Sequence, residues 1–409
     1  MKTVFRKLFD VISMFVIAVS FEGEGLVVDV KPRWRRARCP KCGESCSIHD
    51  TRPLRSWRDL AFGKQVFWLR YAPRRVNCGR CGVHVEQVPW AADGSRFTRR
   101  LEELVAYLAQ QMSKTAVCKL VGIDWRTVGT IVERIIGERL DPTRLDDLTI
   151  IGIDELSFRR NHNYVTVIVD HLRKRIIWVG EGKSSETLGK FFAALGPERA
   201  RLLTHVTMDL SGAYRSAVTE HAPQAELVFD RFHIQRLASD AVDAVRRDEV
   251  RGLAGTTEGK ALKHLRWALL KNPWNLKDRE EQKLSGLQHL NRKIFRAYLL
   301  KESLAAILSG RQPNVAQKAL DDWRAWASRS RLKPFVKLAG TIKRFSHGII
   351  AYVRTGLSNG PLEGLNNKTR MITRRAYGFH RVQALTSMIF LCCGGITLTP
   401  PLPGATSTP

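Results

Sequence analysis

Two pairs of closely spaced cysteines constrain the first part of this chain more than any other feature. Cys39 pairs with Cys42 and Cys78 with Cys81, each in the pattern Cys-x-x-Cys-Gly. This spacing lets both thiolates of a pair bind one tetrahedral zinc ion, and the glycine lets backbone N–H groups turn toward sulfur. The pattern predicts one structural Zn²⁺ site, because four thiolates leave no open coordination position. A redox pair or free thiols are the alternative, and Cys46 is a spare thiol.

The second constraint is the charge of the chain. Its 409 residues include 67 Lys and Arg against 39 Asp and Glu, a formal net charge of +28. A charge this large on a chain with a globular apolar content indicates a polyanionic partner. Nucleic acid is favoured over an acidic membrane surface, because the basic residues are spread over the whole chain and do not line one amphipathic helix.

The N-terminal apolar run at 11–19 follows basic residues and resembles a secretory signal peptide. Asp10 interrupts the apolar region, no small-x-small cleavage site is obvious, and the run continues into a β-like segment at 26–30. We therefore expect N-terminal strands within a zinc-binding module at 1–92, in a cytoplasmic protein with reduced cysteines. No other segment reaches the ~18 apolar residues that span a bilayer, so no membrane partner is expected.

A helix-turn-helix pattern occupies residues 93–140. A periodic helix at 98–111 leads into a second helix, which stops at Gly122, and Asp124 is placed to cap a third. A helical hairpin with a purely structural role is the alternative, and the charge of the chain favours DNA binding. The predicted DNA contacts of this domain are Lys114, Trp125, Arg126, Thr127 and Thr130.

Alternating strands replace helices after Pro142. Three of them have hairpin-length gaps and are expected to be antiparallel. The full order is β-β-β-α-β-α-β, that of the ribonuclease H-like fold, in which the first and fourth strands are neighbours. The predicted elements are strands at 148–154, 164–170, 175–179, 202–209 and 226–229, and helices at 184–195 and 212–221.

The first, second and fourth of these strands end in an aspartate, and the first and fourth are expected to be neighbours. Asp154 follows the first strand and Asp209 the fourth, so the two carboxylates are expected side by side. With a third carboxylate from a helix packed beside the first strand, they suit two Mg²⁺ or Mn²⁺ ions about 3.5–4 Å apart, the arrangement for in-line attack on a phosphodiester. Taken alone, Asp154 is also compatible with an ordinary aspartate at a strand end.

The remainder is predicted to be mostly helical. The segment 231–355 is rich in Lys and Arg, and its four tryptophans, at 267, 274, 323 and 326, are expected to pack between helices. A helix then begins near Pro361 with Glu363 in its first turn. The tail at 396–409 is Pro/Thr-rich and predicted to be disordered. The residues expected to reach phosphates after Glu363 are Asn366, Asn367, Lys368, Arg374 and Arg375.

Four motifs together carry a family resemblance. They are Gly-Ile-Asp-Glu at 152–155, Met-Asp-Leu-Ser at 208–211, Asp-Arg-Phe-His at 230–233 and Ser-Asn-Gly-Pro-Leu-Glu-Gly-Leu-Asn-Asn at 358–367. With the preceding cysteine pairs and helix-turn-helix, the chain resembles an insertion-sequence transposase of the ISL-three family from about Val27 to Leu391.

The resemblance implies a multidomain α/β protein with a ribonuclease H-like catalytic domain at 148–230 and 356–392, interrupted by an α-helical insertion at 231–355. It implies a DDE triad of Asp154, Asp209 and Glu363, and a zinc module that helps to bind terminal inverted repeats. It also implies that His233 helps to position the scissile DNA or the attacking group. A helix-capping Asp230 and a packed His233 are the alternative for that motif.

The function implied is a DNA transposase that binds terminal inverted repeats and target DNA and performs metal-dependent strand cleavage and strand transfer, in the cytoplasm at the bacterial nucleoid. A homo-oligomer is expected when two ends are joined. A non-catalytic DNA-binding regulator derived from such an enzyme is the contrasting hypothesis, and the presence of all three acids disfavours it. An RNA-cleaving ribonuclease H is disfavoured by the helix-turn-helix and the basic insertion.

Overall fold

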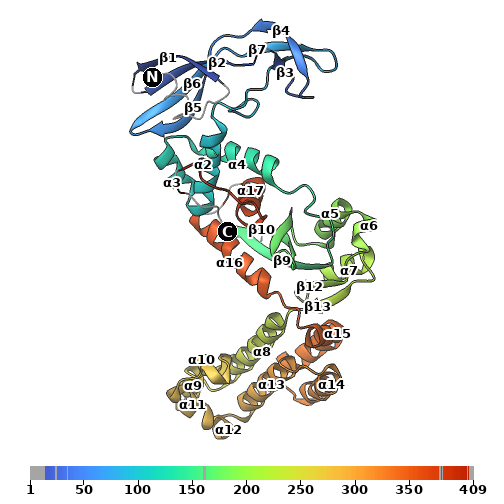
Figure 1. Cartoon of the computed structure of the whole chain (residues 1–409). Helices are drawn as coiled ribbons and strands as arrows, with labels where there is room; N and C mark the ends of the chain where they lie inside the picture. The colour runs from blue at the N-terminus through green and yellow to red at the C-terminus, as the bar shows by residue number, and fades with distance from the viewer. Residues whose placement is uncertain are drawn as a thin grey trace. The chain divides into compact units, whose positions relative to one another are not determined.

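The computed structural model describes residues 14–23, 25–34, 36–159, 163–376, 379, 381–402 and 404, without the side chains of 159, 163 and 361–363. They form two compact units (Figure 1). Unit 1 comprises 1–141, 375–377 and 383–409, and unit 2 comprises 142–374 and 378–382. The start of the apolar run, at 11–13, and the tail at 403 and 405–409 lie outside the described residues.

Unit 1 contains two four-stranded sheets. The first has the order β1-β2-β6-β5 and buries Trp57, Phe67 and Leu69. Its first strand includes residues 14–19 of the run that resembles a signal peptide, so this part is a strand of a sheet, as expected. The bounds of this sheet are β1 (Met14–Glu22), β2 (Gly25–Pro32), β5 (Arg55–Phe62) and β6 (Gln65–Tyr71).

The second sheet, of order β3-β4-β7-β8, carries the cysteine pairs. Ala37 and Val76 form its small apolar core together with cysteine side chains. Its four short strands bury little apolar surface by themselves. The strands are β3 (Ala37–Arg38), β4 (Ser45–Thr51), β7 (Arg74–Cys78) and β8 (Gly82–Val85).

The predicted helix-turn-helix is present as α2 (Arg99–Gln111), α3 (Lys114–Val121) and α4 (Trp125–Arg139). Gly122 ends α3 in the left-handed conformation, with φ 68°, which glycine adopts without steric cost. Asp124 then caps α4 by accepting a hydrogen bond from the N–H of Thr127 at 2.9 Å. Both the turn and the cap follow the sequence prediction.

The last helix, α17 (Val382–Cys393), lies in unit 1 from residue 383 onward, although it was predicted to belong to the catalytic domain. The amide of Gln110 donates to the carbonyls of Leu391, at 2.7 Å, and Ile396, at 3.1 Å. Ile396 and Leu398 are buried, so the first residues of the tail predicted to be disordered pack in this unit.

Unit 2 is built on a five-stranded sheet of order β11-β10-β9-β12-β13. β9, β10 and β11 are antiparallel, and β12 runs parallel to both β9 and β13, so the predicted neighbours β9 and β12 do pair. The strands are β9 (Ile150–Arg159), β10 (Asn163–Asp170), β11 (Arg175–Glu181), β12 (His205–Met208) and β13 (Glu226–Phe229). The helices between them are α5 (Ser185–Leu195), α6 (Pro197–Ala200) and α7 (Gly212–His221).

Strand β9 is longer than predicted. Asp154 lies within it, opposite Val167 of β10, and is not at its end. The shorter β12 pairs with β9 only as far as Gly152. Asp154 therefore stands just beyond the last residue of β9 that β12 covers, and Asp209 follows the end of β12. The two aspartates thus lie on neighbouring strands, Asp209 just after the end of β12 and Asp154 in the middle of β9.

The helical segment packs on the β13 edge of this sheet (Figure 1). Gly348 allows the contact, because a Cβ at this position would lie 2.3 Å from the ring of Phe229. The helices are α8 (Arg231–Gly252), α9 (Thr257–Lys263), α10 (Arg266–Leu270), η1 (Pro273–Asn275), α11 (Asp278–Ser285), α12 (Leu287–Leu290), α13 (Arg292–Leu308), α14 (Pro313–Arg329) and α15 (Lys333–Thr355). A further helix, α16 (Gly360–Arg375), follows.

The expectation that the four tryptophans of this segment pack between helices is wrong for two of them. Trp323 is buried, and its indole N–H donates to the carbonyl of Leu300 at 2.8 Å. Trp267 and Trp274, on the short elements α10 and η1, are 64% and 75% exposed.

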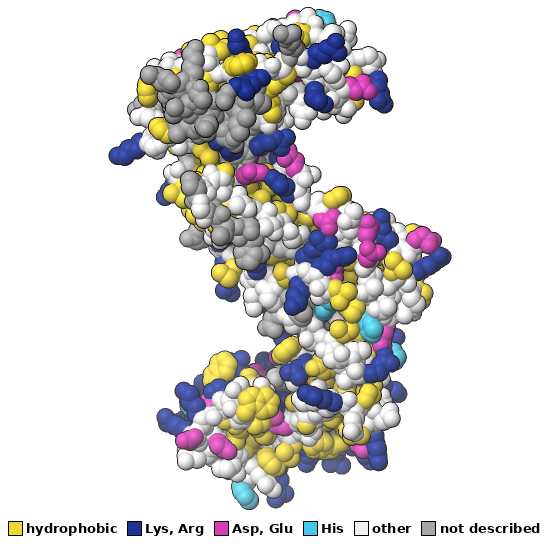
Figure 2. Space-filling view, viewed as in Figure 1, with side chains coloured by type: hydrophobic (Ala, Val, Ile, Leu, Met, Phe, Trp, Pro, Cys, Tyr) yellow, Lys and Arg dark blue, Asp and Glu magenta, His cyan; other side chains and the backbone are white. Residues whose placement is uncertain are grey.

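Lys and Arg side chains are scattered over the face of the molecule shown in Figure 2. No helix among the described residues is both long and apolar enough to cross a membrane. The wide distribution of positive charge agrees with the expectation of a polyanionic partner.

Candidate functional site

The four paired cysteines converge as predicted. The Sγ atoms of Cys39, Cys42, Cys78 and Cys81 all lie within 4.8 Å of one another, and those of Cys42 and Cys78 are 3.6 Å apart. Thiolates 2.3 Å from one tetrahedral zinc ion would lie about 3.8 Å apart, so the cluster fits that ion. Cys46 is buried beside the cluster but is not one of these four; its thiol donates to the carbonyl of Glu44 at 3.4 Å.

Backbone geometry explains why a glycine follows each pair. Gly43 has φ 73° and Gly82 has φ 85°, both in the left-handed region. In the second pair, the N–H groups of Arg80 and Cys81 point at the sulfur of Cys78 and lower the pKa of that thiol to about 6. A thiolate is the form that binds metal, so these turns prepare the sulfur for a cation.

The second site surrounds Asp154 and Asp209 in unit 2. The Nε2 atom of His233 lies 2.9 Å from Oδ1 of Asp209, in an ion pair. Carboxylate oxygens of Asp209 and Asp230 and a ring nitrogen of His233 lie within 4.8 Å of one another. Asp230 caps α8 by accepting from the N–H of Phe232 at 3.2 Å, so it fixes the first turn of the helix that carries His233.

The electrostatics of this site favour a bound cation. Burial, and secondly the negative charge of Asp209, raise the pKa of Asp154 to about 6. The hydrogen bond to Asp209 raises the pKa of His233 above its ordinary value. Burial also raises the pKa of the neighbouring Glu155, which lies 3.8 Å from the ammonium of Lys183. Asp154 and Asp209 are thus close enough for the charge of one to raise the pKa of the other, and the ligand atoms that lie close enough together for one metal ion are those of Asp209, Asp230 and His233.

Helix α16 contributes to the same site through Asn366. This side chain is 4% exposed, and its amide Nδ2 donates a short hydrogen bond to Oδ2 of Asp154. Sequence reasoning expected Asn366 to bind a phosphate and missed this contact. Glu363 occupies a position three residues earlier in α16, and its side chain lies outside the described residues. Positions three apart share a helix face, which is the signal that could have placed Asn366 beside the acids.

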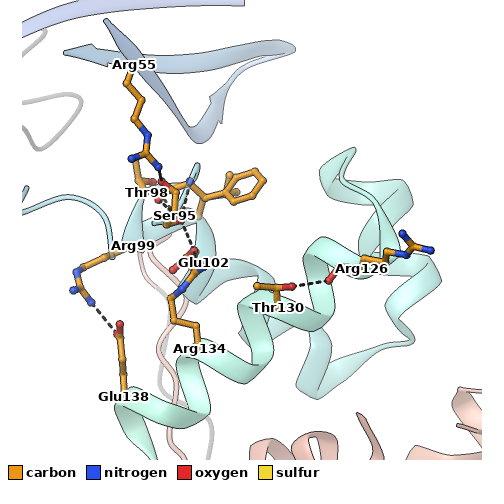
Figure 3. Close-up of polar contacts among 11 residues, drawn as sticks. Arg55, Ser95, Thr98, Arg99, Glu102, Arg126, Thr130, Arg134 and Glu138 are labelled. Atoms are coloured by element: carbon orange, nitrogen blue, oxygen red, sulfur yellow. Dashed lines mark hydrogen bonds and ion pairs between the residues drawn. The ribbon is translucent and has the colours of Figure 1, made fainter. Parts of the chain in front are cut away.

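The helix-turn-helix is held together by polar contacts, of which those of Glu102 are buried (Figure 3). Glu102 of α2 accepts from the hydroxyl of Ser95 at 2.6 Å and forms an ion pair with Arg134 of α4. Arg99 and Glu138 add a second link between the same helices, at 2.8 Å. These contacts fix the direction of α4 against α2.

Arg58 of β5 ties the first sheet to the helix-turn-helix. Its guanidinium donates to the carbonyls of Val121 and Gly122, the latter at 2.8 Å, at the end of α3. The backbone of Arg58 also bonds to that of Arg96 and Thr98, each at 2.9 Å. Sequence reasoning did not find this cap, because Arg58 lies 63 and 64 residues before the two residues whose carbonyls it binds.

The predicted DNA contacts of the helix-turn-helix differ in their exposure. Arg126 and Thr130 are exposed, Trp125 is 47% exposed, and Arg126 points away from the polar network in Figure 3. Thr127 is half-buried and donates to Asp124 at 2.5 Å. Lys114 is only 9% exposed, with its ammonium 4.7 Å from the ring centroid of Trp125. Lys114 therefore supports Trp125 from beneath and is poorly placed to reach a phosphate.

The predicted DNA contacts on α16 also differ in their exposure. Asn367, Lys368 and Arg374 are exposed. Arg375 is half-buried and donates to the carbonyls of Ala109, at 3.0 Å, and Gln110, at 3.1 Å, in the last turn of α2. A cation at the C-terminal end of a helix is favourable, so Arg375 acts there as a cap.

Comparison with known proteins identifies the class. A family model described as a transposase matches residues 151–389, which include the sheet, the acids and the helical segment. A second model, described as the helix-turn-helix domain of transposase family ISL3, matches residues 86–136. The chain belongs to the ISL3 family of transposases, and the resemblance inferred from the motifs is confirmed.

Individual relatives agree. The chain is 39% identical to the transposase for insertion sequence element IS1557 of Mycobacterium tuberculosis, over 99% of this chain and 98% of that one. It is 30% identical to the transposase for insertion sequence element IS1001 of Bordetella parapertussis, over 87% of this chain and 89% of that one.

Proposed function

We propose that this transposase cuts and joins DNA strands at the ends of an insertion sequence, with divalent metal ions held by Asp154, Asp209 and Glu363. The observation that carries the proposal is the placement of Asp154 on β9 and Asp209 just after its paired neighbour β12, close enough for the charge of Asp209 to raise the pKa of Asp154, with a residue of α16 in contact with Asp154. Glu363 is added because it shares a face of α16 with Asn366.

The fold of the catalytic domain is proposed to be ribonuclease H-like. Its support is the strand order, with three antiparallel strands followed by two parallel ones and β9 in the centre. Helices α8 to α15 would then be an insertion between β13 and the helix that carries Glu363.

The residues fit Mg²⁺ or Mn²⁺, because carboxylate oxygens are the ligands these hard cations prefer. Such ions supply activation of the attacking water or 3′ hydroxyl and stabilise the leaving oxygen. The chain itself orients the carboxylates: the N–H of Glu155 donates to Oδ1 of Asp154 at 2.7 Å, and Asn366 donates to Oδ2. His233 holds Asp209 from the α8 side.

DNA binding is assigned to the helix-turn-helix together with the cysteine module, which is proposed to hold one structural Zn²⁺. The exposed Arg126, at the start of α4, is placed like a base- or phosphate-contacting residue of a recognition helix. Terminal inverted repeats are the proposed specific sites, and a dimer is the proposed form when two ends are brought together.

The test is cleavage of duplex DNA that carries the element's own ends, in Mg²⁺ or Mn²⁺. We expect Asp154→Asn, Asp209→Asn and Glu363→Gln each to abolish cleavage while binding of the ends survives. Asp322→Asn, an exposed aspartate on α14, is the matched control and should cut like the wild type. A wild type that binds the ends but never cuts them would instead identify a non-catalytic regulator.

A further inference from the structure

We propose that Asn366 is a positioning residue, which holds the carboxylate of Asp154 in the orientation that receives a divalent cation. The proposal rests on the function proposed above, since it gives Asp154 the role of a metal ligand. It replaces the DNA-contacting role that the sequence suggested for Asn366.

The geometry around Asp154 singles out this residue. Each carboxylate oxygen has one described donor: the backbone N–H of Glu155 on Oδ1 and the amide of Asn366 on Oδ2. The N–H of Glu155 is fixed by the backbone of β9. The amide of Asn366 comes from α16, 212 residues later in the chain. Asn366 is therefore the side chain that sets the rotation of this carboxylate.

The chemistry of an amide suits that task. A lysine or arginine in the same place would neutralise Asp154 and compete with a cation, whereas a neutral N–H donor orients the carboxylate and leaves its charge available. A carboxylate in its place would add a further negative charge and donate nothing. Asn366 is also 4% exposed, which leaves its side chain little room to reach a phosphate.

The oxygen of the same amide is a second polar atom to account for. Oδ1 of Asn366 is buried and has no hydrogen-bond partner in the described structure. Buried polar atoms of native proteins are nearly always paired, so we expect this oxygen to accept a hydrogen bond from a bound ligand or water. A water bound to the cation, or a hydroxyl of the DNA substrate, has the O–H donor it requires.

The experiment is a titration of the full-length, zinc-loaded protein with Mn²⁺ in the absence of DNA. Electron paramagnetic resonance measures the free and bound Mn²⁺ at each point. Asn366→Leu keeps most of the side-chain volume and removes the donor. We expect it to weaken Mn²⁺ affinity about 10–100-fold, the usual effect of losing a residue that orients a metal ligand. Asn366→Ala is the second variant, for use if the leucine of Asn366→Leu disturbs folding, and it should weaken Mn²⁺ affinity to a similar extent. Asn314→Ala, an exposed asparagine of α14, is the matched control and should bind Mn²⁺ like the wild type.

Two readouts separate this role from a structural one and from DNA binding. Cleavage by Asn366→Leu should recover at high Mn²⁺, whereas a merely misfolded variant would not recover, and affinity for the DNA ends should stay at the wild-type value. If Asp154→Asn loses Mn²⁺ binding but Asn366→Leu does not, the positioning role is refuted and the metal site stands. If Asp154→Asn binds Mn²⁺ normally, the proposed function itself fails. Weaker DNA binding with unchanged Mn²⁺ affinity would return Asn366 to the role of a DNA contact.

Discussion

Replacing the half-buried acid Asp154 by Asn is expected to abolish cleavage and yet to stabilise the protein in the absence of Mg²⁺ and Mn²⁺. The pKa of this carboxyl rises from 3.8 to about 6 on folding, mainly through burial. The folded state thus binds the proton more tightly than the unfolded state. The free energy of unfolding therefore falls as pH rises from 3.8 to 6, and the loss is complete above that range.

The size of the effect follows from these two pKa values. Each unit of difference corresponds to 1.36 kcal/mol, so ionised Asp154 costs about 3 kcal/mol of stability at pH 8 and about 1 kcal/mol at pH 4.5. An asparagine carries no such cost. Its oxygen can accept from the N–H of Glu155, and a rotated Asn366 amide can offer its unpartnered Oδ1 to the new NH₂ group.

The assay is unfolding in urea, monitored by hydrogen exchange of peptides from β9 to β13. These peptides report on the unfolding of unit 2 alone. Asp154→Asn should raise the free energy of unfolding by about 3 kcal/mol at pH 8 and by about 1 kcal/mol at pH 4.5. The exposed Asp322→Asn should change neither value. Adding Mn²⁺ should stabilise the wild type but not Asp154→Asn. An equal change at the two pH values, or a loss of stability at pH 8, would refute the reasoning.

Two further predictions concern unit 1. Cys42→Ser should release zinc and weaken binding of the DNA ends while unit 2 stays folded; unchanged zinc content by atomic absorption would defeat the zinc assignment. Arg58→Met removes two hydrogen bonds from a charged donor to the end of α3, and should lower the free energy of unfolding of unit 1 by about 2–4 kcal/mol in urea titrations. The exposed Arg52→Met is its control, and equal effects of the two would show that the cap does not stabilise the helix-turn-helix.

Much of the local structure follows from short stretches of sequence. Gly122 and Asp124 define the turn and the cap of α4, because each acts on residues within one helical turn. The cysteine pairs predicted the four-sulfur cluster for the same reason, since a spacing of three brings the two sulfurs of each pair close together. The apolar runs of unit 2 predicted the number of strands in its sheet, and the motifs around Asp154 and Asp209 indicated the family.

Tertiary structure alone decided how these pieces meet. Because β12 is short, Asp154 lies beyond the part of β9 that pairs with it. Because α16 approaches β9, Asn366 donates to Asp154, although the sequence suggested that it binds a phosphate. Exposure of Trp267 was likewise invisible in the sequence. Burial, a raised pKa and a contact across 212 residues all depend on which distant segments cover a side chain, and no local pattern of residues encodes that.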